Sequence, residues 1–78
     1  MEKITAKQER VLTELKKYLA KKGYPPTVRE LCDLTNLSST ATVQVHLDHL
    51  QEKGYIKKDK IKNRTIELLV PNEYDIKN

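Results

Sequence analysis

Two helix signals separated by one short turn constrain the fold of this chain more than any other feature. Thr27 and Glu30 have the spacing of a capping box, in which each side chain bonds the backbone N–H of the other at the start of a helix. That helix should end near Thr35, and a serine at 38 or 39 should cap another that runs to Gly54. Asn36 tolerates the positive φ that a tight turn between helices needs. The segment therefore predicts two helices joined by a turn.

A longer helix should precede this pair. Thr5 and Gln8 form a second capping box, and Gly23 stands where helices commonly end in a left-handed glycine. Prolines at 25 and 26 then make a stiff connector that cannot continue the helix. Between the two ends, apolar residues repeat at helical spacing: Val11, Leu12, Leu15 and Leu19.

The helix that follows Asn36 should have two different faces. At about 100° per residue, three apolar side chains fall within about 60° of one another and form a stripe for the core: Val43, Leu47 and Leu50. The residues that point directly away are Ala41, Val45 and Asp48, flanked by Thr42, Gln44 and His49. This outer face is small and nearly uncharged, whereas a merely solvated helix would carry Lys and Glu. It is suited to insertion into a groove.

A basic hairpin should follow Gly54. Residues 55–58 and 64–69 alternate as two strands do, with 59–63 as the loop. Residues 57–64 carry five basic side chains and one acidic one, a local charge of +4 that equals the net charge of the chain. These patterns predict an α+β fold, a winged helix-turn-helix of three helices and a two-stranded antiparallel hairpin. We expect this domain to span residues 1–70, with a flexible tail or linker at 71–78.

Composition limits what else the chain can be. Its 78 residues suffice for one small aliphatic core, and 15 basic against 11 acidic residues suit a polyanionic partner. Cys32 is expected to be a small buried thiol, and His46 a histidine at the edge of the core bonded to a backbone group. The sequence contains no apolar run long enough to cross a membrane and no signal peptide, which indicates a cytoplasmic protein. With no nucleophile–base pair and no metal-ligand cluster, we expect neither an enzyme nor a cofactor.

Five features of the chain form a recognisable set: TAKQ at 5–8, GYPPTVRE at 23–30, Ser39, HL at 46–47 and KGYI at 53–56. Together they resemble the N-terminal DNA-binding domain of the LexA family, the repressors of the SOS response to DNA damage, and the similarity covers about residues 4–69. The resemblance implies a winged helix-turn-helix whose third helix enters the major groove of double-stranded DNA. It also implies two copies on an inverted-repeat operator, with weak or DNA-induced dimerisation, that block transcription of DNA-damage genes.

The resemblance places base contacts in the early part of the third helix. Carried over by position, they fall on Ser39, Ala41, Thr42, Gln44 and Val45, and the helical projection independently places the last four on the outer face. Phosphate contacts are expected from the basic residues in and beside the hairpin: Lys53, Lys57, Lys58, Lys60, Lys62 and Arg64. An ordinary lysine-rich hairpin that protects a strand edge is the alternative.

Two further phosphate contacts are expected at helix starts. Lys7 and Thr27 lie where backbone N–H groups can hold a phosphate. For their side chains, the interpretation as a surface lysine and a helix cap is equally good, and the two interpretations of Thr27 are compatible.

The sequence departs from the family pattern on the outer face. Ala41 and Val45 lack polar groups that some members carry there, so the operator can differ from those of better-known members. Gln44 can pair with adenine N6 and N7, whereas Thr42 and Val45 can touch thymine methyl groups.

Complete LexA proteins continue into a self-cleaving domain with a Ser-Lys dyad, which also dimerises, and these 78 residues contain none of it. The chain is expected to be either an excised domain or a stand-alone protein with the same fold. Two other functions stay open. One is a winged-helix module that binds a partner protein through the outer face. The other is the DNA-binding part of a replication or plasmid-maintenance protein.

Overall fold

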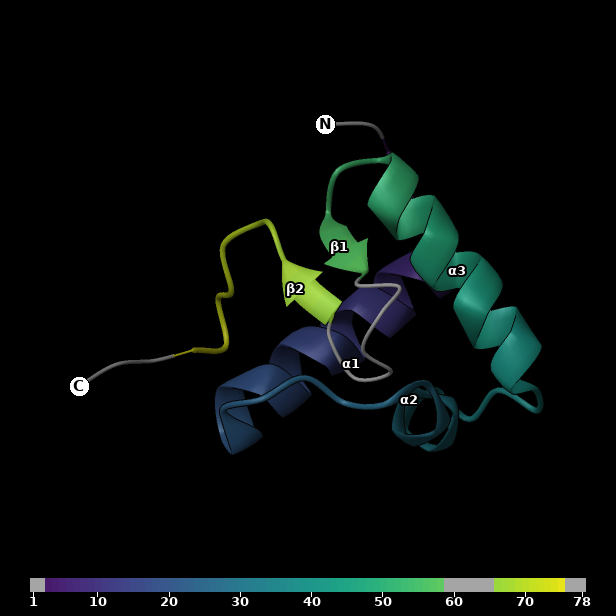
Figure 1. Ribbon diagram of the computed structural model, residues 1–78, viewed down its shortest axis with the longest axis horizontal. Helices are drawn as coiled ribbons and strands as arrows, with labels where there is room; N and C mark the ends of the chain where they lie inside the picture. The colour runs from purple at the N-terminus through teal and green to yellow at the C-terminus, as the bar shows by residue number, and fades with distance from the viewer. Residues whose placement is uncertain (1–2, 59–65, 76–78) are drawn as a thin grey trace.

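The computed structural model describes residues 3–58 and 66–75. Three helices, α1 (Ala6–Lys22), α2 (Val28–Thr35) and α3 (Thr40–Glu52), are followed by the strands β1 (Ile56–Lys58) and β2 (Ile66–Leu68) (Figure 1). The predicted α+β winged helix-turn-helix is confirmed. None of the described helices combines the length and the apolarity needed to cross a membrane.

The helix ends lie where local sequence signals predict them. Thr5 and Gln8 form the capping box of α1, and Thr27 and Glu30 form that of α2. Gly23, which follows α1, has φ +83°. Asn36, which follows α2, has φ +61° and is the only described residue other than glycine with a positive φ. The turn signals therefore fix where α1 and α2 begin and end.

The turn between α2 and α3 is closed by two hydrogen bonds. The Leu37 N–H donates to the carbonyl of Cys32 at 3.2 Å, and the Cys32 thiol donates to the carbonyl of Leu37 at 2.8 Å. Cys32 is half-buried rather than buried, because its sulfur lies against this turn at the margin of the core. Leu37 is partly buried and packs on the core.

Glu30 connects the helix pair to α1. Its carboxylate accepts from the backbone N–H of Thr27 and from the Tyr18 hydroxyl, each at 2.8 Å. The hydrogen bond to Glu30 and burial raise the pKa of Tyr18 to about 12. The residue that caps α2 therefore also anchors it to α1.

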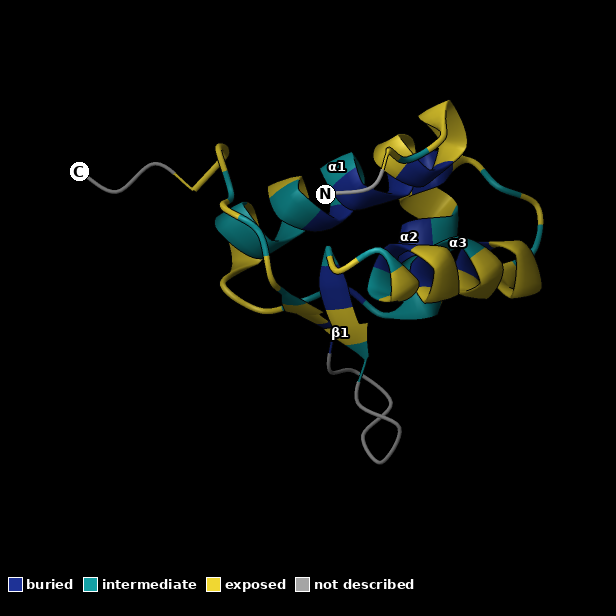
Figure 2. Ribbon diagram, turned by 90° about the horizontal axis from the view of Figure 1, so that it is seen from above, coloured by how far each residue is buried: buried dark blue, intermediate teal, exposed yellow. Residues whose placement is uncertain are grey.

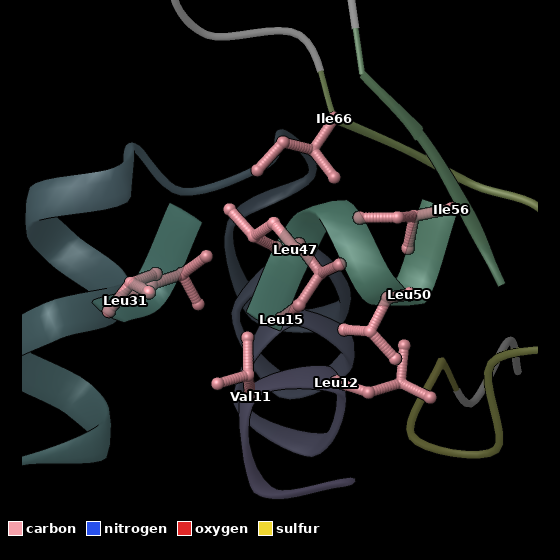
Figure 3. Packing of buried hydrophobic residues seen from close by; sticks show 9 residues of the cluster. Val11, Leu12, Leu15, Leu31, Leu47, Leu50, Ile56 and Ile66 are labelled. Carbon is pink, nitrogen blue, oxygen red and sulfur yellow. The ribbon is translucent and has the colours of Figure 1, made fainter. Parts of the chain in front are cut away.

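The core is aliphatic and draws on every described helix and strand (Figure 3). The predicted stripe of α3 is confirmed, since Val43, Leu47 and Leu50 are all fully buried. The other buried apolar residues in the cluster are Val11, Leu12, Leu15, Leu31, Ile56 and Ile66. Leu34 follows Leu31 at helical spacing, yet it is 40% exposed, because α1 and α3 cover the side of this short helix that carries Leu31.

The two strands pair antiparallel, with Ile56 opposite Leu68 and Lys57 opposite Glu67. β1 begins one residue after the predicted start at 55, and β2 ends one residue before the predicted end at 69. The Leu69 N–H still donates to the carbonyl of Tyr55 at 2.9 Å, which continues the pairing one residue beyond the strands. The predicted loop 59–63 and the start of the second strand lie outside the described residues.

The segment after β2 returns to α1. The Asn72 side chain donates to the carbonyl of Lys16 at 2.9 Å, and Glu73 lies 2.8 Å from the Lys16 ammonium. The Lys17 ammonium lies 5.6 Å from the centre of the Tyr74 ring. The predicted boundary between a domain at 1–70 and a tail at 71–78 stays a prediction, but residues 72–74 make specific contacts with α1.

Candidate nucleic-acid interface

The outer face of α3 is exposed as the helical projection predicts. Ala41, Thr42, Gln44 and Val45 are all exposed, and Val45 keeps half of its surface accessible. Figure 2 shows α3 exposed along its outer side, with buried residues turned toward the other helices. The four predicted base-contact residues within α3 therefore share one accessible surface on the rim of the molecule.

Ser39, the remaining predicted base contact, is the N-cap of α3. Its hydroxyl accepts from the Ala41 N–H at 3.2 Å, and the residue is half-buried. It lines a mostly polar hollow between α2 and the start of α3, together with Arg29, Cys32, Asp33, Leu37, Ser38 and Thr40. Ser39 therefore fixes the start of the outer face, and a base contact from it stays a prediction.

Arg29 is a cation at this hollow that the sequence reasoning did not select. It is exposed in the first turn of α2, between the two capping-box residues Thr27 and Glu30. The sequence signal that could have identified Arg29 is its place between Thr27 and Glu30, in the first turn of a capped helix. The hollow thus has a guanidinium beside the start of α3.

The predicted phosphate-contacting residues of the hairpin have different surroundings. Lys57 is exposed on β1, opposite Glu67. The Lys58 ammonium forms a salt bridge with Asp48 of α3 at 2.6 Å, so it ties β1 to α3. Lys60, Lys62 and Arg64 lie outside the described residues.

At the start of α1, Gln8 connects two helices. It is 5% exposed, and its Oε1 accepts from the Lys53 ammonium at 2.9 Å, just after α3 ends. Its Nε2 lies 2.8 Å from Nδ1 of His49. Lys53 can still donate elsewhere because an ammonium has three protons. Lys7 is exposed in the first turn of α1, next to this network.

Thr27 has both of its polar groups engaged in the cap of α2. Its hydroxyl accepts from the Glu30 N–H at 3.1 Å, and its own N–H donates to the Glu30 carboxylate. The cap interpretation is therefore confirmed. A phosphate contact at this helix start is left to the N–H groups that follow Thr27, and it stays a prediction.

His46 differs from its prediction. A hydrogen bond to a backbone group was expected, but within residues 3–58 and 66–75 both ring nitrogens are buried without a partner. Burial, with the neighbouring His49 and Lys7, lowers the pKa of His46 below its ordinary 6.5. The periodicity placed this residue at the core edge, but it could not show that no carbonyl faces the ring. Its surroundings therefore favour the neutral form of the His46 ring.

Stability should depend on pH through His46. Because its folded pKa lies below its unfolded value, the unfolded chain binds the proton first as pH falls below about 6.5. The free energy of unfolding should therefore decrease with acidity, by at most about 1.4 kcal/mol per pH unit for one proton. Urea denaturation at a series of pH values from about 8 to about 5 measures this slope. His46→Leu should reduce the slope. His49→Leu should keep most of the His46 contribution, because it removes one smaller cause and leaves the burial of His46 in place. Equal slopes in wild type and His46→Leu would contradict the assignment.

No group of three or more His, Cys, Asp or Glu side chains in the described part of the chain could hold a metal ion.

The candidate interface is a nearly uncharged face of α3 with cations near both ends. Arg29 lies near its start, and Lys7 and Lys53 lie near its end.

Residues 1–65 match the family described as the LexA DNA binding domain. This chain belongs to the LexA DNA-binding domain family. The LexA repressor of Caldicellulosiruptor saccharolyticus is 49% identical over 91% of the chain, and that of Bacillus mycoides is 47% identical over 92%. The LexA repressor of Bacillus anthracis is 45% identical over 96%. The chain spans about a third of the length of these relatives, at 35%, 35% and 36% respectively.

Proposed function

We propose that this LexA-type domain binds duplex DNA sequence-specifically and represses transcription. The observation that carries the proposal is the outer face of α3, which is exposed, nearly uncharged and supported from behind by three fully buried residues. A rigid helix of this kind fits the major groove, where each base pair presents a distinct pattern of donors, acceptors and methyl groups. The relatives are named LexA repressors, which supports repression as the outcome.

Base recognition would divide between polar and apolar contacts. Gln44 has the amide that can pair with adenine N6 and N7, and Thr42 and Val45 offer methyl groups to thymine. Ala41 would allow close approach, and Ser39 would act from the cap of α3. Gln44, Thr42 and Val45 together favour an operator half-site rich in A·T pairs.

Phosphate contacts would hold α3 in register. Lys57 and Lys7 are exposed, and Lys53 keeps protons for further bonds beyond the one to Gln8. Each neutralised phosphate releases counterions, so affinity should fall steeply with salt. We include Lys58, Lys60, Lys62, Arg64 and the helix start at Thr27 in the same proposal.

Two copies would bind an inverted repeat, because the LexA-type domain reads one half-site and a two-fold operator presents two. We propose that dimerisation of this domain is weak or induced by DNA. A repressor of this type would act in the cytoplasm, on the chromosome of its cell, and we assign no catalytic step to this domain.

Fluorescence anisotropy tests the proposal with a labelled SOS-type palindrome and a scrambled duplex of the same composition, at two salt concentrations. Tighter binding to the palindrome that weakens with salt is the expected result. Equal binding to both duplexes would reject that operator. No binding to either duplex, at protein concentrations that allow weak dimers, would reject DNA binding and favour a module whose exposed Val45 meets a protein.

A further inference from the structure

We propose that His49 is a further DNA-phosphate contact and that Gln8 positions it by fixing which ring nitrogen carries the proton. The contact would be a neutral N–H donor at the edge of the outer face of α3. The inference rests on the proposed DNA binding, and it adds a residue that the family resemblance did not single out.

The orientation of the Gln8 amide follows from its partners. Its Oε1 lies 3.2 Å from the backbone N of Thr5 and 2.9 Å from the Lys53 ammonium. Both groups can only donate, so the atom between them has to be the amide oxygen. The other amide atom, which faces His49, is therefore the nitrogen, and ambiguity between amide O and N does not arise here.

The tautomer of His49 follows in turn. The Gln8 Nε2 lies 2.8 Å from Nδ1 of His49, and an amide NH₂ group can only donate. Nδ1 therefore accepts the hydrogen bond, and in the neutral ring the proton is on Nε2. The ring is held at one nitrogen by a 5% exposed glutamine, while the residue itself is exposed. A buried residue thus orients an exposed donor.

The Nε2–H donor of His49 lies where the phosphate backbone of bound DNA would run. His49 and Thr42 are about two turns apart and about 20° apart around the helix axis, so they share the α1 side of the outer face. The first turn of α1 lies on the same side, and its positive end favours an anion. Lys53 donates to the same Gln8, and Lys7 precedes Gln8 in the first turn of α1. A phosphate at this rim would meet the Nε2–H of His49 among cations.

The proposed contact has a signature that separates it from the lysines. A neutral donor displaces no condensed counterion, whereas each lysine on a phosphate adds about 0.9 to the salt slope. Removing His49 should therefore weaken binding without changing how binding depends on salt. Because phosphates carry no sequence information, the palindrome and the scrambled duplex should be affected alike.

The binding experiment compares wild type, His49→Ala and His49→Gln well above the ordinary imidazole pKa of about 6.5. His49→Ala should weaken binding to both duplexes by about three- to tenfold with the salt slope unchanged. His49→Gln, which restores a neutral N–H donor on a flexible side chain, should recover part of the loss. Thermal melting confirms that both variants are folded.

Imidazole NMR tests the positioning by Gln8. Long-range ¹H–¹⁵N spectra of the free wild-type domain should show His49 protonated at Nε2, with this signal shifting when DNA is added. Gln8→Glu replaces the amide donor by a carboxylate oxygen, so Nδ1 of His49 should then carry a proton. If that variant does not fold, the wild-type spectrum and the alanine variant still decide the question.

Three results would overturn the inference while leaving DNA binding intact. The first is that His49→Ala binds both duplexes as tightly as wild type, and the second is an Nδ1–H tautomer in the wild-type domain. A change in the salt slope at this pH would also reject a neutral contact. If the wild-type domain binds neither duplex, the failure lies with the proposed function, and the tautomer measurement still tests the role of Gln8.

Discussion

Replacing Leu47 by alanine should destabilise the domain by about 2–5 kcal/mol. Leu47 is fully buried on the inner side of α3, within the cluster drawn in Figure 3. The loss combines the transfer free energy of the removed methyl groups with the cavity that remains, since a close-packed core relaxes only partly. A domain of this size has a total stability on the order of 4–12 kcal/mol. The substitution would therefore remove a large fraction of it.

Val45→Ala is the matched control on the same helix. Val45 is 50% exposed on the outer face, so its truncation should change the free energy of unfolding by no more than about 0.5 kcal/mol. Urea denaturation followed by circular dichroism measures both variants. A loss below about 1 kcal/mol for Leu47→Ala would mean that α3 does not pack through this stripe, and the assignment of its outer face would fail with it.

The parts of the fold that depend on short-range chemistry could be predicted from the sequence. Both capping boxes involve residues three apart, so Thr5 with Gln8 and Thr27 with Glu30 are readable without the fold. The positive φ of Asn36 follows from the shortness of one turn. The two faces of α3 follow from helical periodicity, because a 13-residue helix repeats the pattern often enough to define a stripe.

The parts of the fold that depend on contacts between distant segments could not be predicted from the sequence. Gln8 was identified as a cap, but its bonds to His49 and Lys53 join residues more than forty positions apart. The contact of Asn72 with α1 spans an even longer separation. Leu34 shows the limit of periodicity in a helix of 8 residues, where two turns do not specify how wide the buried side is.

The same distinction between short-range patterns and contacts of distant segments applies to the candidate site. Exposure of the α3 residues was predictable because it is the complement of the core stripe. The ion pair between Lys58 and Asp48 was not, because it depends on how β1 lies against α3. The sequence alone could not distinguish the six basic residues within or beside the hairpin from one another. The structure shows that Lys57 is exposed, that Lys58 is paired and that Lys53 is bonded to Gln8.

Gln44→Ala should cost about 1–3 kcal/mol of operator binding and relax the base preference at one position of each half-site. The side chain is exposed on α3 and supports nothing in the core, so the loss should come from recognition rather than from folding. Alanine also has the higher helix propensity, which should leave α3 intact. Anisotropy titrations against operators that carry every base pair at each position measure the effect.

The pattern across those operators is the decisive result. Loss of the Gln44 amide should flatten discrimination at a single base pair, and should leave both the scrambled duplex and the salt slope unchanged, because no phosphate charge is involved. Lys22→Ala, at the exposed end of α1 away from α3 (Figure 1), is the control for an indirect effect of surface changes. If Gln44→Ala kept full discrimination, α3 would have to be rotated so that the Thr42 side faces the bases. His49 would then lie inside the groove, and its removal would affect the palindrome more than the scrambled duplex.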